Sequence, residues 1–149
     1  MRILFTIFTL FLFLLGCAGI APKMHEFENK EIFEGSFDQI WSAIIETFAE
    51  RTIPIANMEK VSGFIATEEI KFPSEYADCG ATPIGVKFGS TGVLGIFNVF
   101  VKEISTNKYN ISINARYRFI TDNLYYKGCE STGKIETWFL STVRGKLRK

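Results

Sequence analysis

The three cysteines and the single histidine are the residues of this chain that can take part in the widest range of chemistry. Cys79 and Cys129 could form a disulfide, act as a redox couple or bind a metal, whereas Cys17 ends an apolar N-terminal run. A redox couple usually has Cys-x-x-Cys spacing, which is absent, and a metal site would need more ligands than two cysteines and His25. We therefore expect neither a metal site nor redox chemistry at this pair.

Catalysis at a serine or cysteine nucleophile would need a general base. The only histidine lies in residues 18–30, which show no sustained hydrophobic period and are predicted to be a flexible tether. Glu68, Glu69 and Asp78 come nearest to a carboxylate cluster, but adjacent strand residues point to opposite faces, so we interpret them as solvated charge. The glycines of residues 85–95 lack the spacing of a phosphate-binding loop. We predict that the chain is not an enzyme and binds no cofactor.

The N-terminus has the organisation of a secretory signal. Arg2 precedes an unbroken run of apolar or threonine residues from 3 to 15, which is too short to span a bilayer, and Gly16 stands just before Cys17. The pattern resembles the bacterial lipobox, in which the cysteine is acylated and becomes the first residue after cleavage. The resemblance implies that residues 1–16 are removed and that Cys17 is the lipid attachment site.

This resemblance also implies a location. Three acyl chains would hold the protein stably to a membrane. By similarity to enterobacterial sorting, Ala18 in the place of an aspartate favours the outer membrane of a Gram-negative host, facing the periplasm. Loss of residues 1–16 leaves sixteen basic and sixteen acidic residues, so nucleic acid is not an expected partner. We expect the membrane, through Cys17, and an envelope protein to be the partners.

Cys79 and Cys129 are the two cysteines that remain once Cys17 carries lipid. The periplasm is oxidising, so these two are predicted to form a disulfide. The bridge would join a predicted loop over 71–85 to the segment that enters the last helix, and its role would be structural.

Two helices are predicted, over about 37–52 and 132–147. Ser36 and Gln39 form a capping-box pattern before the first helix. Its apolar face has helical spacing and comprises Phe37, Ile40, Trp41, Ile44, Ile45 and Phe48. The second helix ends in a basic cluster, which we interpret as compensation of the helix dipole rather than as a site for anionic lipid or glycan. That cluster comprises Arg144, Lys146, Arg148 and Lys149.

Strand patterns fill most of the chain between and before the helices. Period-two or short apolar runs predict strands over 31–35, 55–59, 64–70, 86–88, 93–104 and 109–119. Apolar residues occupy both faces of 93–104, so we predict a central strand that is covered on both sides. Residues 109–119 alternate strictly, which predicts one buried and one wet face. The fold class is therefore α+β, a curved antiparallel sheet with two packed helices in the order β-α-β-β-β-β-α.

Part of this chain resembles a known family. Residues 37–41 (Phe-Asp-Gln-Ile-Trp), the apolar helix, Pro54-Ile55 and the turn over 60–65 look like the repeated domain of BamC, a lipoprotein of the outer-membrane β-barrel assembly machine. The resemblance covers residues 31–70 well and the rest only by element order. It implies a helix-grip fold, in which a curved sheet holds a long terminal helix. The chain is then divided into a signal peptide (1–16), a lipidated tether (17–30) and one domain (31–149).

Two functions are consistent with these features. One is a non-catalytic protein-interaction module of the envelope, acting in outer-membrane assembly or maintenance, for which Leu124, Tyr125 and Tyr126 are candidate partner-binding residues. The other is a module that binds a small hydrophobic ligand or a lipid in a cavity between helix and sheet. A filled core would favour the first, and a continuous cavity would favour the second.

Overall fold

A computed structural model describes residues 19–120 and 126–148 of the chain. The first half contains β1 (Lys30–Glu34), helix α2 (Phe37–Glu50), β2 (Ile55–Glu59), β3 (Phe64–Thr67) and β4 (Ile70–Phe72). A short 3-10 turn, η1 (Ser74–Tyr76), leads into β5 (Ala77–Asp78). The second half contains β6 (Val93–Ser105), β7 (Lys108–Ile120), β8 (Tyr126–Ser131) and helix α3 (Lys134–Leu147).

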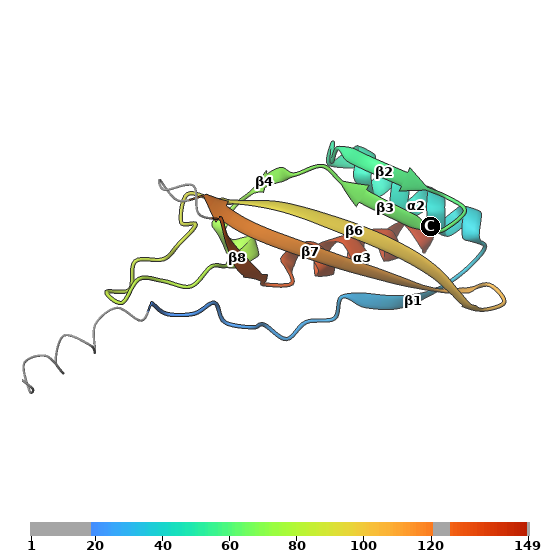
Figure 1. Cartoon of the computed structure of the whole chain (residues 1–149). Helices are drawn as coiled ribbons and strands as arrows, with labels where there is room; N and C mark the ends of the chain where they lie inside the picture. Colours follow the sequence, from blue (N-terminus) through green and yellow to red (C-terminus); the bar gives the residue numbers. More distant parts are fainter. Residues whose placement is uncertain (1–18, 121–125, 149) are drawn as a thin grey trace, which may run out of the picture.

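The strands form one antiparallel sheet in the order β2-β3-β6-β7-β8-β5. The long pair β6 and β7 is its centre, and β1 and β4 are added beside β7 and β6 (Figure 1). The predicted α+β class and the antiparallel sheet with two helices are therefore confirmed for the described residues. The prediction that 93–104 is a central strand is also confirmed, since β6 pairs with β3 and β4 on one side and with β7 on the other.

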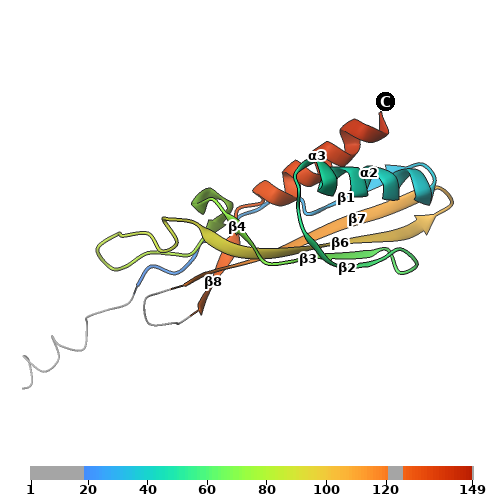
Figure 2. The ribbon, with the colours of Figure 1, turned by 90° about the horizontal axis from the view of Figure 1, so that it is seen from above.

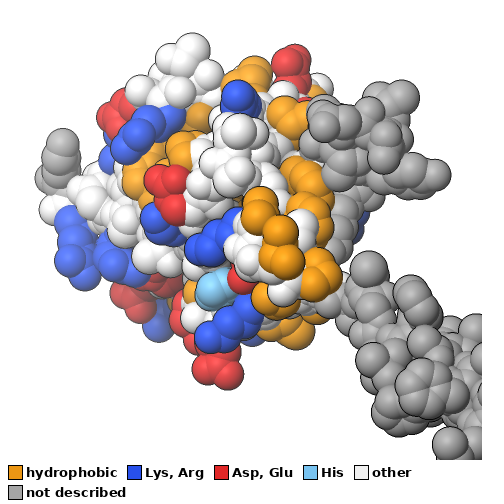
Figure 3. Space-filling view, turned by 90° about the vertical axis from the view of Figure 1, so that its left-hand side faces the viewer, with side chains coloured by type: hydrophobic (Ala, Val, Ile, Leu, Met, Phe, Trp, Pro, Cys, Tyr) orange, Lys and Arg blue, Asp and Glu red, His pale blue; other side chains and the backbone are white. Residues whose placement is uncertain are grey.

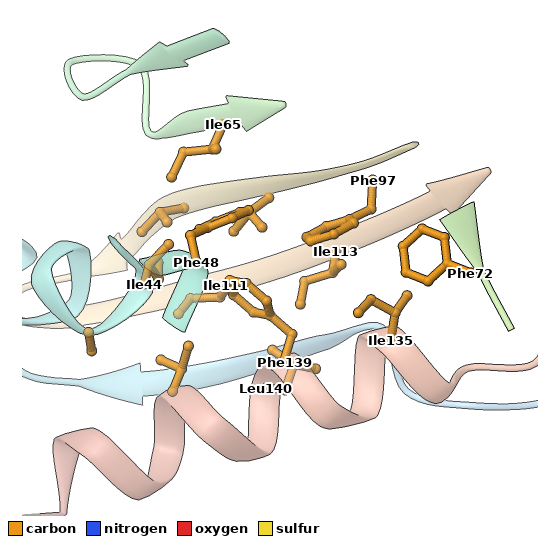
Figure 4. Close-up of a cluster of buried hydrophobic side chains, with 14 of the residues drawn as sticks. Ile44, Phe48, Ile65, Phe72, Phe97, Ile111, Ile113, Ile135, Phe139 and Leu140 are labelled. Atoms are coloured by element: carbon orange, nitrogen blue, oxygen red, sulfur yellow. The ribbon is translucent and has the colours of Figure 1, made fainter. Parts of the chain in front are cut away.

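Both helices lie on the same face of the sheet (Figure 2). Phe48 of α2, Phe97 of β6 and Phe139 of α3 meet in the core, with ring centroids 5.2 to 5.9 Å apart. Figure 4 shows these rings pointing toward one another, surrounded by isoleucine and leucine side chains. Burial of this aromatic and aliphatic cluster is the main source of stability that holds the helices to the sheet.

Helix α2 begins where the sequence predicts. The Ser36 hydroxyl accepts a hydrogen bond from the Gln39 N–H at 3.3 Å, and the Gln39 side chain accepts one from the Ser36 N–H at 3.0 Å, which completes the capping box. The helix ends at Glu50, two residues before the predicted end, because Thr52 adopts a left-handed conformation with φ of 51°.

The prediction that β6 is covered on both faces is wrong. Val93, Phe97 and Val99 point into the core, whereas Ile96 and Phe100 on the other face are 43% and 40% exposed. Hydropathy alone does not reveal this, since an apolar side chain is equally apolar on a covered face and on an open one. With both helices on one face, no described element packs on the other.

The predicted strand over 64–70 is divided in two. β3 and β4 both pair with β6, but the chain leaves the ladder at Glu68 and Glu69. The Thr67 hydroxyl accepts the Phe97 N–H at 3.1 Å, so a side chain satisfies a backbone donor where the strand is interrupted.

Other strands differ from the prediction as well. Residues 86–88 form no strand and contribute only a bridge between Lys87 and Ala81. Local patterns do not predict β8, β5 or the separate β4, and the predicted loop over 71–85 contains part of β4, η1 and β5. These pieces have only two to six residues each, and their pairing with β6, β7 and each other, rather than a local pattern, makes them strands.

Candidate interaction surfaces

Several predicted site residues lie outside the described part of the chain. Cys17, Leu124 and Tyr125 belong to this group, as does the side chain of Tyr126, whose backbone begins β8. Lipid attachment at Cys17 and partner binding at residues 124–126 therefore remain predictions.

The predicted disulfide between Cys79 and Cys129 is present. It joins the residue after β5 to a residue of β8, next to the two-residue pairing of Ala77 with Ser131 and Asp78 with Glu130. Because so short a strand pair is weak by itself, the covalent link holds β5 and the loop that follows it against the sheet.

Three large apolar side chains lie on the uncovered face of the sheet. Phe64 of β3 lies directly across from Phe100 of β6, and Ile96 follows on the same face of β6. We call Phe64, Ile96 and Phe100 the open-face patch. Phe64 is half-buried, whereas Ile96 and Phe100 are exposed, so part of this apolar surface is open to a partner.

Polar residues lie within and beside the open-face patch. Asn98 lies between Ile96 and Phe100 on the same face of β6 and pairs with Asn114 of β7, whose side-chain amide donates to Asn98 Oδ1 at 3.4 Å. Asn29 in turn donates to Asn114 at 3.2 Å. Arg116 lies across from Ile96 on β7. This face is therefore mixed apolar and polar, which is the composition that non-obligate protein interfaces have.

A groove of about 520 Å³ opens where β7 has no strand beside it, between β1 and β8. Glu136 of α3 lies at its base and is 1% exposed. Ser131 Oγ donates to its carboxylate oxygens at 2.9 and 3.1 Å, and the Ala115 N–H donates to the same carboxylate. Burial raises the pKa of Glu136, and these donors oppose the rise only in part. The Glu136 carboxylate therefore accepts a hydrogen bond from a backbone N–H of β7 at a position where β7 has no neighbouring strand on that side.

Tyr117 is buried beside Glu136. Its hydroxyl makes no hydrogen bond of standard geometry within the described residues, although Ser131 is close enough to lower its pKa slightly. Burial and the charge of Glu136 together raise the pKa of Tyr117 well above its usual range. The hydroxyl therefore stays neutral at physiological pH.

His25 does not complete a catalytic arrangement with these groups. Its Nε2 atom lies 3.7 Å from an Asp78 carboxylate oxygen, whereas Ser131 Oγ donates to Glu136 and accepts the Gly133 N–H at 3.1 Å. Among the described residues, no group of three or more His, Cys, Asp or Glu side chains is placed to hold a metal ion. That the chain is not an enzyme stays a prediction.

The predicted tether is partly attached to the domain. Ile20 and Ala81 exchange two backbone hydrogen bonds of 2.8 and 3.0 Å. The Asp78 carboxylate accepts the Lys23 N–H, and the Asn29 carbonyl accepts the Ile113 N–H at 2.8 Å. His25 therefore lies in a segment that contacts the domain, not in the free segment that its sequence indicates.

The carboxylates and basic residues singled out in the sequence are mostly paired. Glu69 and Arg118 form a bidentate ion pair at 2.6 and 2.7 Å, while Asp78 lies apart beside His25. Arg144 pairs with Glu31 of β1, and Lys146 with Glu46 and Glu50 of α2. Arg144 and Lys146 of the C-terminal basic cluster thus join α3 to β1 and α2, which supports a structural role for these two residues, while Lys149 lies outside the described residues.

Comparisons with known proteins give no family for this chain. No family model and no curated protein matches it. The resemblance to the BamC domain therefore stays a hypothesis. Within residues 19–120 and 126–148, no helix has both the length and the hydropathy needed to cross a membrane.

Proposed function

We propose that this chain is a lipid-anchored lipoprotein of the bacterial outer membrane, facing the periplasm, whose domain acts as a non-catalytic protein-interaction module. The N-terminal signal ending at Cys17 supports the anchor. The open-face patch supports the interaction, and it is the single observation on which this part depends. A domain whose helices cover only one face of its sheet keeps the other available to a partner.

The fold proposal is more specific than α+β. We propose that α3 and the antiparallel sheet form a helix-grip arrangement related to the BamC repeat. Two features support this proposal: residues 31–70 resemble the BamC repeat, and the elements follow in the same order. The last element, α3, packs against β7 and β1. This relation favours a role in outer-membrane assembly or maintenance.

The alternative function, a carrier of a small hydrophobic ligand or lipid, has weaker support. Phe48, Phe97 and Phe139 fill the space between the helices and the sheet, where such a carrier would need a cavity. The groove above Glu136 is bordered by a buried carboxyl group, which is unfavourable next to a purely apolar ligand.

Site-specific photo-crosslinking in intact cells tests the interaction. A photoreactive phenylalanine analogue at Phe100 should give protein adducts, whereas the same analogue at Ser141, an exposed residue of α3, should give far fewer. Adducts with β-barrel assembly components would support the role in outer-membrane assembly. Equal protein yields at the two positions would contradict the use of the open face.

A further inference from the structure

One end of the domain gathers exposed apolar side chains and lysines around the start of the described chain. Ile20, Ile84 and Val86 are 55%, 87% and 57% exposed. Lys23 and Lys87 line the same shallow groove as Ile20. We call these five residues the anchor end. In Figure 3 orange and blue side chains lie side by side on this end of the molecule.

The two segments of the anchor end are held together by backbone contacts. Ile20 pairs with Ala81, and Ala81 also bridges to Lys87. Gly80 has φ of +75°, and a Cβ atom there would lie 2.2 Å from the Ile20 carbonyl oxygen. Only glycine permits so close an approach of the two backbones. The N-terminal segment is therefore fixed to the loop rather than free to swing.

This attachment limits how far the domain can lie from a lipid on Cys17. Ile20 is three residues from Cys17, and a fully extended chain spans at most about 3.6 Å per residue, or about 11 Å here. The polar region of each leaflet is itself several ångströms thick. A protein acylated at Cys17 thus holds Ile20, and with it the loop over 80–88, at the level of the lipid headgroups.

We propose that the anchor end docks onto the surface of a phospholipid bilayer. Ile20, Ile84 and Val86 would enter the boundary between headgroups and acyl chains, and Lys23 and Lys87 would lie among the lipid phosphates. Asp78, Glu75 and His25 line the same groove, and the Asp78 carboxylate is already occupied by the Gly80 and Lys23 N–H groups. The inference rests on the proposed lipid anchor and adds that the domain lies against the bilayer in one orientation.

The docked orientation leaves the other end of the molecule directed away from the membrane. The β2–β3 turn lies at the end opposite the anchor end (Figure 1). Val61 in that turn is fully exposed and is as apolar as Ile84 and Val86 of the anchor end. It is therefore a matched control for these two residues. If apolar exposure alone decided lipid contact, Val61 would behave like Ile84.

Lipid photo-crosslinking of the full chain in membranes of a Gram-negative host tests this orientation. A diazirine amino acid at Ile84 or Val86 should yield phospholipid adducts at least about tenfold more often than one at Val61. Ile84→Glu should reduce the adduct at residue 86 at least about fivefold, whereas Val61→Glu should leave it unchanged. Both substituted side chains are exposed, so neither change should affect folding.

The outcomes separate this inference from the proposed anchor. The mass of the Cys17 peptide from the same membranes reports acylation independently. An acylated chain with equal lipid yields at Ile84 and Val61, or with protein adducts alone at Ile84, would overturn docking and leave the anchor intact. An unacylated chain that is held by its apolar segment and still gives lipid adducts at Ile84 would support docking and refute the anchor. A chain found only in the soluble fraction would overturn both.

Discussion

Removal of the Cys79–Cys129 disulfide should lower the free energy of unfolding by about 4 kcal/mol. The bridge closes a loop of 50 residues, and the loss of loop-closure entropy in the unfolded chain predicts this magnitude. A small domain has only about 5 to 15 kcal/mol of stability, so the loss would be a large fraction of the total. With a urea m-value of about 2 kcal/mol per molar, the midpoint of unfolding should fall by about 2 M.

Urea unfolding of the Cys79→Ala/Cys129→Ala variant measures this effect, with Cys17→Ser as the common background. The Cys17→Ser chain with its disulfide reduced is the matched comparison, because it keeps the sulfur atoms of Cys79 and Cys129 and loses only the covalent link. Similar losses in the two samples would assign the effect to the link, and a larger loss in the variant would add the cost of the missing sulfur atoms. A loss below about 1 kcal/mol in both would refute the argument from loop closure.

Three further predictions concern buried and strained positions, and urea unfolding tests each of them. Phe139→Ala should lose about 3 to 5 kcal/mol, because Phe139 is fully buried against Phe48; a loss below about 1.5 kcal/mol would contradict the filled core. Gly63→Ala should lose about 1 to 3 kcal/mol, because Gly63 has φ of +68° and the added Cβ would lie 2.3 Å from the Val101 carbonyl oxygen; unchanged stability would contradict the reported backbone. The raised pKa of Glu136 means that the folded state holds its proton more tightly than the unfolded state, so stability should decrease as the pH rises above about 4.5 through that raised value. Glu136→Gln should remove this decrease, and an identical pH profile would show that the group does not titrate as described.

Local sequence patterns were sufficient to predict an element when the residues that determine it lie within that element. The capping box at Ser36 and the apolar stripe of α2 predict a helix whose observed start is the same. The alternation of residues 109–119 predicts β7 and its buried face, since a strand with one wet side must repeat every two residues. The disulfide could be predicted from the number of cysteines together with the expected oxidising compartment.

Features that depend on distant parts of the chain were not predictable in this way. β8 is a strand because β7 and β5 lie on either side of it, and its own residues include Gly128 and Glu130. The open-face patch is exposed because both helices pack on the other face of the sheet. Residues 19–29 have no period of their own, and backbone partners such as Ala81 and Ile113 fix them to the domain. In each case the determining contact is distant in sequence.

The most direct test of lipid anchoring is the mass of the N-terminal peptide of the protein isolated from membranes. A lipid-anchored chain should begin at Cys17 and carry three fatty acyl chains, and a Cys17→Ser variant that is cleaved at another position should move to the soluble fraction. A chain that begins at Met1 with an unmodified Cys17, or a membrane-bound Cys17→Ser variant cleaved at another position, would contradict it.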